Sequence, residues 1–193
     1  SSAEGYAEAF LGPCSANAER RPGEADGITV NPYFGTDGVT PFLQRWERGK
    51  GVFALVRTSN PSACQIQELI VDGTPLYVHI GRLVEEWGAS CRGSSEYSAL
   101  GAVVGATQPE AIRILREIMP HAIFLLPGLG AQGASADDVV KAFDKRGMGA
   151  VVNSSRGILF AYKDSDDPRA FATAANRAAL RVKQSINEAL RRA

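Results

Sequence analysis

The sequence predicts an α/β fold built on a parallel β-sheet, and two observations lead to that prediction. Five short apolar segments are continuous rather than alternating, as parallel strands covered on both faces require. Each is followed by a polar or glycine-rich turn and then by apolar residues at helical spacing, an alternation typical of parallel α/β folds. The predicted strands are 27–31, 51–56, 99–104, 122–126 and 149–153.

Several of the predicted helices carry recognisable start signals. Ser1 and Glu4 have the spacing of a capping box, which predicts a helix at the start of the chain. Pro109 stands where a helix begins and its missing N–H costs little. Ser135 is a predicted N-cap followed by acidic residues. The helices expected after the first are 39–48, 62–70, 75–88, 109–118, 136–146 and 168–192.

Two architectures fit this alternation, a doubly wound open sheet and a (β/α)8 barrel. The 193 residues are enough for one domain with a real core. Five strands are too few to close a barrel, although they suffice for an open sheet. Composition and periodicity leave both architectures open.

The charge balance argues against some classes of partner. Lys plus Arg and Asp plus Glu both number 21, so the formal net charge is zero. A neutral chain has no overall attraction to nucleic acids or membrane surfaces, and neither partner is expected. No segment approaches the roughly 20 apolar residues of a membrane span. Any anion must therefore be bound by a local site.

The cysteines and histidines give no sign of a metal site. Cys14, Cys64 and Cys91 are widely spaced and form no CxxC, which favours reduced thiols in a cytoplasmic protein. His79 and His121 lie far apart in apolar surroundings, where a structural role is expected. No carboxylate cluster replaces them, so we expect no metal.

A glycine-rich turn follows the fourth predicted strand. Residues 127–133 contain G-x-G-x-x-G, the pattern of dinucleotide-binding loops. That fingerprint also expects an acidic residue at the end of the next strand, where this chain has Asn153, Ser154, Ser155 and Arg156. The nicotinamide interpretation therefore lacks its second element. What remains is a loop whose flexible glycines expose backbone N–H groups to an anion, to which the Gln132 side chain can also donate.

Two further turns follow predicted strands. Arg156 lies just past a strand and beside a glycine, where a guanidinium can clamp a phosphate or pair with a surface carboxylate. The glycine loop one βα unit earlier favours the phosphate. In the turn 57–61, Ser59 and Asn60 can hydrogen-bond a planar polar ligand or cap a helix that starts at Pro61. Local grounds alone favour the cap.

These turns, in this order, resemble the orotidine 5'-monophosphate decarboxylase family, and in particular its type 2, mycobacterial-like branch. The motifs that carry the resemblance are RTSNPSA (57–63), LLPGLGAQG (125–133) and VVNSSRGILFAY (151–162), with SSAEGYAEAFLG (1–12) and ITVNPYFGTDGVTPFL (28–43). The likeness extends from the first residue to about Asp167.

The resemblance implies a (β/α)8 TIM barrel, of which residues 1–193 would be the C-terminal portion, with strands four to eight. It implies a lyase of de novo pyrimidine biosynthesis that converts orotidine 5'-monophosphate to UMP and CO2. The family works without a metal or organic cofactor, usually as a homodimer with active sites at the subunit interface. The alternative is a phosphate- or dinucleotide-binding α/β module without this activity.

The resemblance also assigns substrate-binding roles to five residues. Ser59 would contact the pyrimidine ring. Gln132 and Arg156 would hold the 5'-phosphate, helped by the backbone N–H groups of Ser155 and Arg156. Ser2 would lie near the ribose bound by the neighbouring subunit.

The catalytic motif of the family is absent from these residues. Its chemistry depends on a Lys/Asp array that includes a D-x-K-x-x-D motif, and none occurs among the 193 residues. In the family this motif comes immediately before the segment that residues 1–4 match. We therefore expect the motif upstream of Ser1, no catalytic residue within the chain, and no decarboxylase activity from the chain alone.

Overall fold

The computed structural model describes residues 1–15, 17, 19, 22–130, 133–164 and 168–193. Across these residues one five-stranded sheet has the order β1-β2-β5-β6-β7, and every neighbouring pair is parallel. The predicted strands are confirmed to within two residues at each end. The strands are β1 (Gly27–Val30), β2 (Gly51–Arg57), β5 (Leu100–Val104), β6 (Phe124–Pro127) and β7 (Ala150–Asn153).

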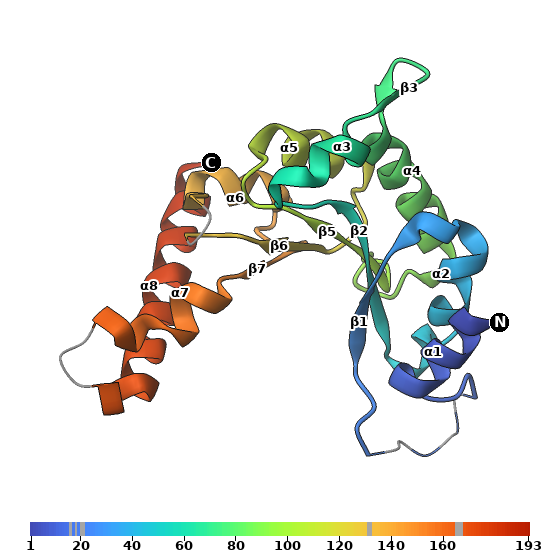
Figure 1. Cartoon of the computed structure of the whole chain (residues 1–193), viewed down its shortest axis with the longest axis horizontal. Coiled ribbons are helices and arrows are strands. Elements are labelled where there is room, and N and C mark those ends of the chain that lie inside the picture. The colour runs from blue at the N-terminus through green and yellow to red at the C-terminus, as the bar shows by residue number, and fades with distance from the viewer. Residues whose placement is uncertain (16, 18, 20–21, 131–132, 165–167) are drawn as a thin grey trace.

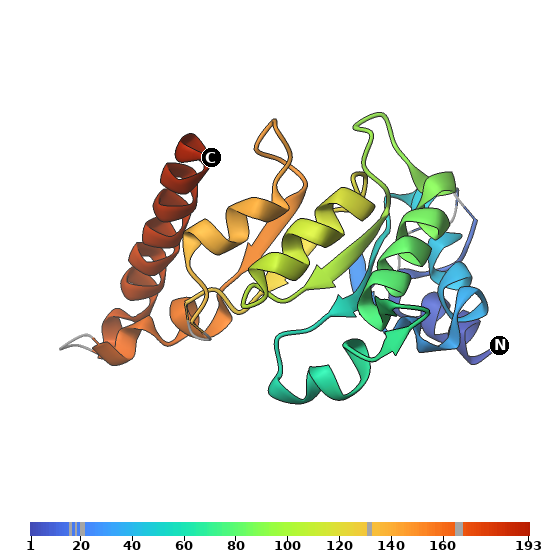
Figure 2. The same ribbon diagram turned by 90° about the horizontal axis from the view of Figure 1, so that it is seen from above.

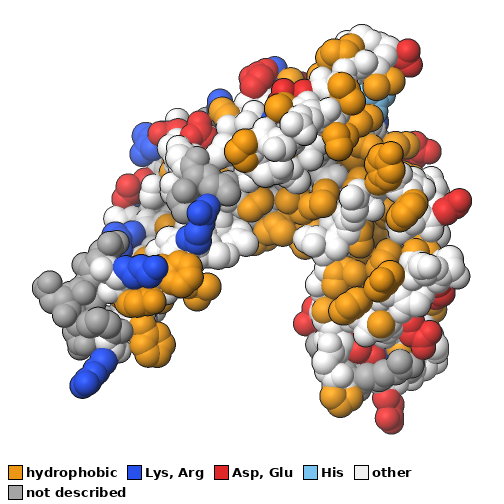
Figure 3. All heavy atoms as spheres, in the orientation of Figure 1, with side chains coloured by type: hydrophobic (Ala, Val, Ile, Leu, Met, Phe, Trp, Pro, Cys, Tyr) orange, Lys and Arg blue, Asp and Glu red, His pale blue; other side chains and the backbone are white. Residues whose placement is uncertain are grey.

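The sheet is open and curved into an arch, with β1 and β7 at its two edges (Figure 1). Helices cover its outer side, and Figure 2 shows α4 and α5 side by side over the strands. Hydrophobic side chains gather on the concave side, between the two arms (Figure 3). The main helices are α1 (Ser2–Leu11), α2 (Thr36–Leu43), α3 (Cys64–Gln67), α4 (Leu76–Gly88), α5 (Pro109–Ile118), α6 (Ala136–Val139), α7 (Ser155–Leu159) and α8 (Phe171–Arg192).

Three predicted helices are shorter than expected. The helix predicted over 39–48 is interrupted after Leu43 and resumes as a 3-10 turn. The one over 136–146 ends with a 3-10 turn at Ala142. The one over 62–70 ends at Gln67, and a hairpin of β3 (Ile70–Val71) and β4 (Thr74–Pro75) follows. Asp72 and Gly73 both have positive φ, as tight hairpin turns require.

The core lies between the sheet and its outer helices. All five residues of β5, the central strand, are buried. From α5, Ile112 and Leu115 are fully buried, as is Phe124 of β6. The packing of an amphipathic helix on a fully covered parallel strand is what the continuous apolar segments predicted.

Helix α1 is fastened by a buried arginine. Ser1 caps it by accepting a hydrogen bond from the Glu4 N–H at 3.2 Å, but the predicted capping box is incomplete. The Glu4 carboxylate instead accepts from Arg45 at 2.8 Å. Arg45 is 1% exposed, and its Nε also donates to the Gly12 carbonyl at 2.6 Å. Both ends of α1, and so the position of Ser2, are fixed by these contacts.

A second, partly buried arginine joins the segments at the amino edge of the sheet. Arg116 of α5 donates to the carbonyl oxygens of Ala142, Met119, Ala122 and Gly149, at distances of 2.8 to 2.9 Å. Its guanidinium also lies 3.7 Å from the centre of the Phe124 ring. Burial lowers the pKa of Arg116 to about 10, which leaves it charged at neutral pH.

Asp144, at the same edge, is expected to make stability depend on pH. Burial alone would raise its pKa, but hydrogen bonds from the Tyr97 hydroxyl at 2.5 Å, the Met148 N–H and Arg146 outweigh burial and hold that pKa well below its ordinary value. The stabilisation is fully present above the unfolded-state pKa of about 3.9. It is lost as pH falls below that value through the folded-state pKa.

The measurement is the unfolding free energy of wild type and Asp144→Asn from pH 7 to pH 2. The advantage of the wild type should be constant down to about pH 5 and should shrink below pH 4. A difference that does not change with pH would show that the Asp144 carboxylate is not held in this way.

Candidate functional site at the carboxyl edge of the sheet

The loops that follow β2, β5, β6 and β7 are joined by hydrogen bonds. The Gly105 N–H donates to the Arg57 carbonyl at 2.6 Å, and the Ala106 N–H donates to the Pro127 carbonyl at 2.9 Å. The Ser154 hydroxyl donates to the Leu129 carbonyl at 3.1 Å. These loops therefore form one continuous edge, the edge at which parallel α/β folds bind ligands.

A small cleft lies at the β6–β7 end of this edge. It has a volume of about 160 Å³ and is lined by residues 127–129 and 153–156. Complete ligand pockets hold about 300–1,000 Å³, so this cleft fits one end of a ligand, such as a phosphate group. The structure thus brings Ser155 and Arg156 beside the start of the glycine loop.

The glycine loop needs its glycines. Gly128, Gly130 and Gly133 have φ values of 106°, 75° and 90°, in the left-handed region that other residues rarely adopt. The loop is closed by a hydrogen bond from the Gly130 N–H to the Ala134 carbonyl at 3.1 Å. Gln132, the predicted phosphate ligand on this loop, lies outside the described residues.

The helix after the glycine loop is capped by its own residues. The Ser135 N–H and hydroxyl both donate to the Asp138 carboxylate, at 2.8 and 2.6 Å, and these bonds lower the pKa of Asp138. A carboxylate thus already occupies the positive end of α6. In dinucleotide-binding folds that end faces the pyrophosphate, so this arrangement speaks against the nicotinamide interpretation.

Arg156 is available to a ligand. Its side chain is exposed and forms no hydrogen bond or ion pair with any residue that the structure describes. The alternative in which Arg156 pairs with a surface carboxylate therefore finds no such carboxylate among those residues. It lies in the first turn of α7, where backbone N–H groups have no intrahelical acceptor. Ser154 fixes this turn from below, because its buried hydroxyl is bound to the neighbouring loop.

Ser59 lies on the same edge, above β5. A Cβ atom added to Gly105 would lie 2.8 Å from the Ser59 Cβ and 2.8 Å from its backbone nitrogen, so the two backbones are in direct contact. Asn60 occupies the N-cap position before a 3-10 helix that starts at Pro61, as local grounds favoured, but its side chain makes no capping hydrogen bond. The Thr58 hydroxyl, two residues away, donates to the Asn60 side-chain oxygen at 2.6 Å instead.

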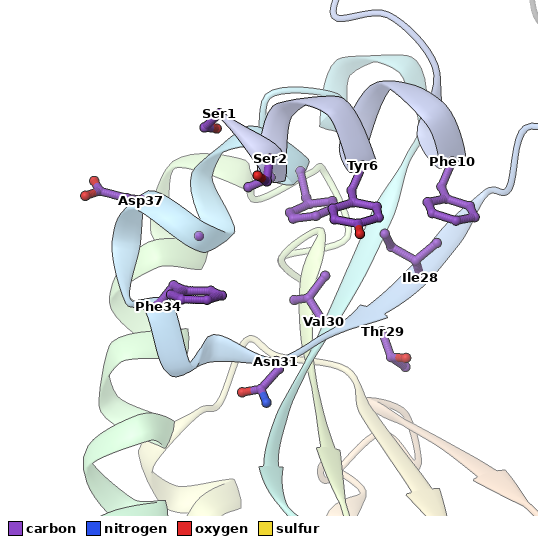
Figure 4. Close-up of a pocket in the computed structure, with 13 residues that line it drawn as sticks. Ser1, Ser2, Tyr6, Phe10, Ile28, Thr29, Val30, Asn31, Phe34 and Asp37 are labelled. Atoms are coloured by element: carbon purple, nitrogen blue, oxygen red, sulfur yellow. The ribbon is translucent and has the colours of Figure 1, made fainter.

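Ser2 is not brought to this cleft. It lines a separate cavity of about 940 Å³ between α1, β1 and α2 (Figure 4). Tyr6 and Phe10 of α1 extend over Ile28 of β1 in this cavity, whose lining is largely apolar. Because β1 and β7 lie at opposite edges of the sheet, Ser2 and the cleft are at opposite ends of the arch.

Two residues of the site escaped the sequence interpretation. The sequence places Ser154 in a polar turn, yet its side chain is buried and joins the β6 and β7 loops. Gly105 leaves room for Ser59. The signal for Gly105 was its place directly after an apolar strand, where a glycine often marks the close approach of another backbone.

Among the described residues, no group of three or more His, Cys, Asp or Glu is arranged to hold a metal ion. In the same part of the chain, none of the helices has the length and apolar character needed to cross a membrane. His79 and His121 have structural partners, the Val71 carbonyl and the Glu85 carboxylate.

Comparisons of the sequence with a family model and with curated proteins point to the same family. The model of the orotidine 5'-phosphate decarboxylase / HUMPS family matches residues 14–172. An orotidine 5'-phosphate decarboxylase of Caldicellulosiruptor bescii is 46% identical over 195 residues, which cover 98% of this chain and 63% of that protein. One from Rhodopirellula baltica is 50% identical over 164 residues, 84% of this chain and 54% of that protein.

A comparison with solved structures points to the same family. The structure of Leishmania donovani OMP decarboxylase superposes with a TM-score of 0.72 at 29% identity, covering 96% of this chain and 63% of that one. The chain thus spans somewhat less than two thirds of the length of these relatives. With a family model matched over most of its length and relatives aligned along nearly all of it, the chain belongs to the orotidine 5'-phosphate decarboxylase / HUMPS family.

Proposed function

We propose that this chain provides the phosphate and pyrimidine contacts of an orotidine 5'-monophosphate decarboxylase. The observation that carries the proposal is the small cleft in which Arg156 lies beside the left-handed glycine loop, with its side chain exposed and not bonded to any residue that the structure describes. A guanidinium and exposed backbone N–H groups are suited to a phosphate dianion. The relatives named for this activity support the same substrate.

In this proposal five residues bind different parts of the substrate. Arg156 and Gln132 bind the 5'-phosphate, with the N–H groups of Ser155 and Arg156. Ser59 binds the pyrimidine ring, and Ser2 contacts the ribose held by the neighbouring subunit. The grip on the phosphate supplies binding energy far from the reacting carbon, which can stabilise the transition state. The carboxyl group leaves as CO2, and a proton takes its place on the ring to give UMP, without a cofactor.

The acid and base groups belong, in this proposal, to a D-x-K-x-x-D motif outside these 193 residues. The five strands are then strands four to eight of a (β/α)8 barrel of the type 2 branch. The open edges at β1 and β7 support this, because unpaired edge strands accept further strands. These 193 residues alone would then form no UMP from orotidine 5'-monophosphate.

The same proposal includes a homodimer. Tyr33 and Phe34, in the loop after β1, are 83% and 85% exposed, and Phe34 and Ser2 line one cavity. Large exposed aromatic side chains are enriched at protein interfaces. A subunit seated on this loop would cover both rings and bring its ligand near Ser2.

Ligand class is the direct test of the proposed function. The intact protein that contains this chain is expected to bind UMP, and NAD is expected not to bind. The reason is that the cleft accommodates one phosphate group, while Asp138 occupies the end of α6 that a pyrophosphate would need. Isothermal titration calorimetry with each nucleotide is the measurement. Binding of NAD together with no binding of UMP would reverse the proposal.

A further inference from the structure

The turn that carries Ser59 is held from outside the sheet by a single side chain of α3. The Thr58 N–H donates to Gln67 Oε1 at 2.9 Å, and Gln67 Nε2 donates to Thr58 Oγ1 at 2.9 Å. The Thr58 hydroxyl in turn donates to Asn60 Oδ1. One amide therefore satisfies both the backbone donor and the hydroxyl acceptor of Thr58, which requires a side chain with a donor and an acceptor together.

A buried charge holds α3 in place for this contact. Arg57 is the last residue of β2, its side chain is 5% exposed, and it follows an irregularity in the pairing of β2 with β5. Its Nη2 donates to the Glu68 carboxylate at 2.5 Å, directly after Gln67. The end of α3 is thus fastened to the end of β2 by a charge-assisted bond beside the two amide bonds.

Ser59 is confined from the other side by Gly105, the residue directly after β5. No side chain fits between it and Gly105, so the turn has Gly105 beneath it and Gln67 beside it. Apart from this turn, Gln67 is surrounded by residues at the surface of the molecule. Ile66 and Leu69, its near neighbours, are 59% and 54% exposed, and the hairpin that follows projects from the arch (Figure 1). Gln67 therefore supports the turn and not the core.

We infer that Gln67 is a positioning residue that sets the place of Ser59 and so controls how the site binds the ring end of its nucleotide. This inference rests on the proposed function, in which Ser59 contacts the pyrimidine. Gln67 itself does not touch the ligand. Loss of the Gln67 side chain should weaken the binding only of ligands that carry a base.

The test compares two ligands on the intact protein, UMP and ribose 5-phosphate, which share the phosphate but not the ring. Gln67→Ala removes both bonds to Thr58 and is expected to raise the Kd for UMP about threefold to tenfold, the range of one net hydrogen bond. The Kd for ribose 5-phosphate should not change. Gln67→Glu keeps an acceptor for the Thr58 N–H and should restore part of the UMP affinity.

The matched control is Gln65→Ala, on the same short helix. Gln65 is exposed and forms no hydrogen bond with the rest of the described chain, so both affinities should stay at the wild-type value. Thermal unfolding of each variant establishes that it is folded. A double-mutant cycle adds a readout that a general loss of structure would not give. If Gln67 acts through Ser59, then Ser59→Ala together with Gln67→Ala should be no worse than Ser59→Ala alone.

The outcomes distinguish the positioning role of Gln67 from the proposed function itself. Equal weakening of UMP and ribose 5-phosphate, or additive losses in the double variant, would overturn the positioning role. Wild-type binding of UMP with an unchanged affinity in Gln67→Ala would overturn it as well, while leaving the proposed function intact. A wild-type protein that binds no UMP would instead refute the proposed function, and the ring-end role of Gln67 with it.

Discussion

Replacing Arg116 with methionine is expected to lower the free energy of unfolding of the intact protein by about 3 kcal/mol or more. The side chain is partly buried and donates at 2.8 to 2.9 Å to four backbone carbonyls that join the end of α5 to the segments before β6 and β7. Methionine fills much of the space but donates nothing. Each carbonyl that loses its partner without gaining water costs about 1–3 kcal/mol, and the contact with the Phe124 ring is lost too.

Arg113 is the matched control for this experiment. It lies one turn earlier on α5, half exposed, and pairs with Glu110 and Glu117 on the helix surface. Exposed pairs of this kind contribute well under about 1 kcal/mol. Chemical denaturation of Arg116→Met and Arg113→Met should therefore give clearly different unfolding free energies. Similar small losses in both would mean that Arg116 does not hold the amino edge together.

Replacing Arg156 with alanine is expected to weaken UMP binding about tenfold to a hundredfold, the range of one charge-assisted hydrogen bond to a phosphate. The value of kcat/KM for orotidine 5'-monophosphate should fall by at least as much. Because the exposed Arg156 side chain forms no hydrogen bond or ion pair with the other described residues, its removal leaves no buried group unpaired and should not change the unfolding free energy.

Uridine, which lacks the phosphate, separates a ligand role from a structural one. Its affinity should be nearly the same in Arg156→Ala and in the wild type. Arg181→Ala, which removes an exposed arginine of α8, controls for net charge and should leave UMP binding unchanged. If Arg156→Ala weakens uridine and UMP to the same extent, the arginine is structural.

The strands could be predicted because each is a continuous apolar segment, although only the central strand β5 is buried along its whole length and the edge strands β1 and β7 are partly exposed. The site could be predicted only in part. Arg156 and the glycine loop lie at successive strand ends, which any parallel sheet brings together. The support of Ser59 could not be predicted, because Gln67 is a polar residue on a polar helix and its partner is decided by how that helix docks. The Asp72-Gly73 pair does indicate a tight turn in the hairpin after α3. That indication is easily missed, because the residues on either side of the pair have helical spacing.

The contact between Ser59 and Gly105 has a consequence for the entropy of binding. With no side chain between the two backbones, the serine turn rests on the main chain next to β5, whose residues are all buried. The most deeply packed strand of the sheet thus limits the motion of the turn. A turn ordered before any ligand arrives loses little conformational freedom when the ligand binds. In the proposed role of Ser59, the part of the site that binds the pyrimidine ring would therefore be ordered before the ligand arrives, and shape rather than induced closure would determine its selectivity.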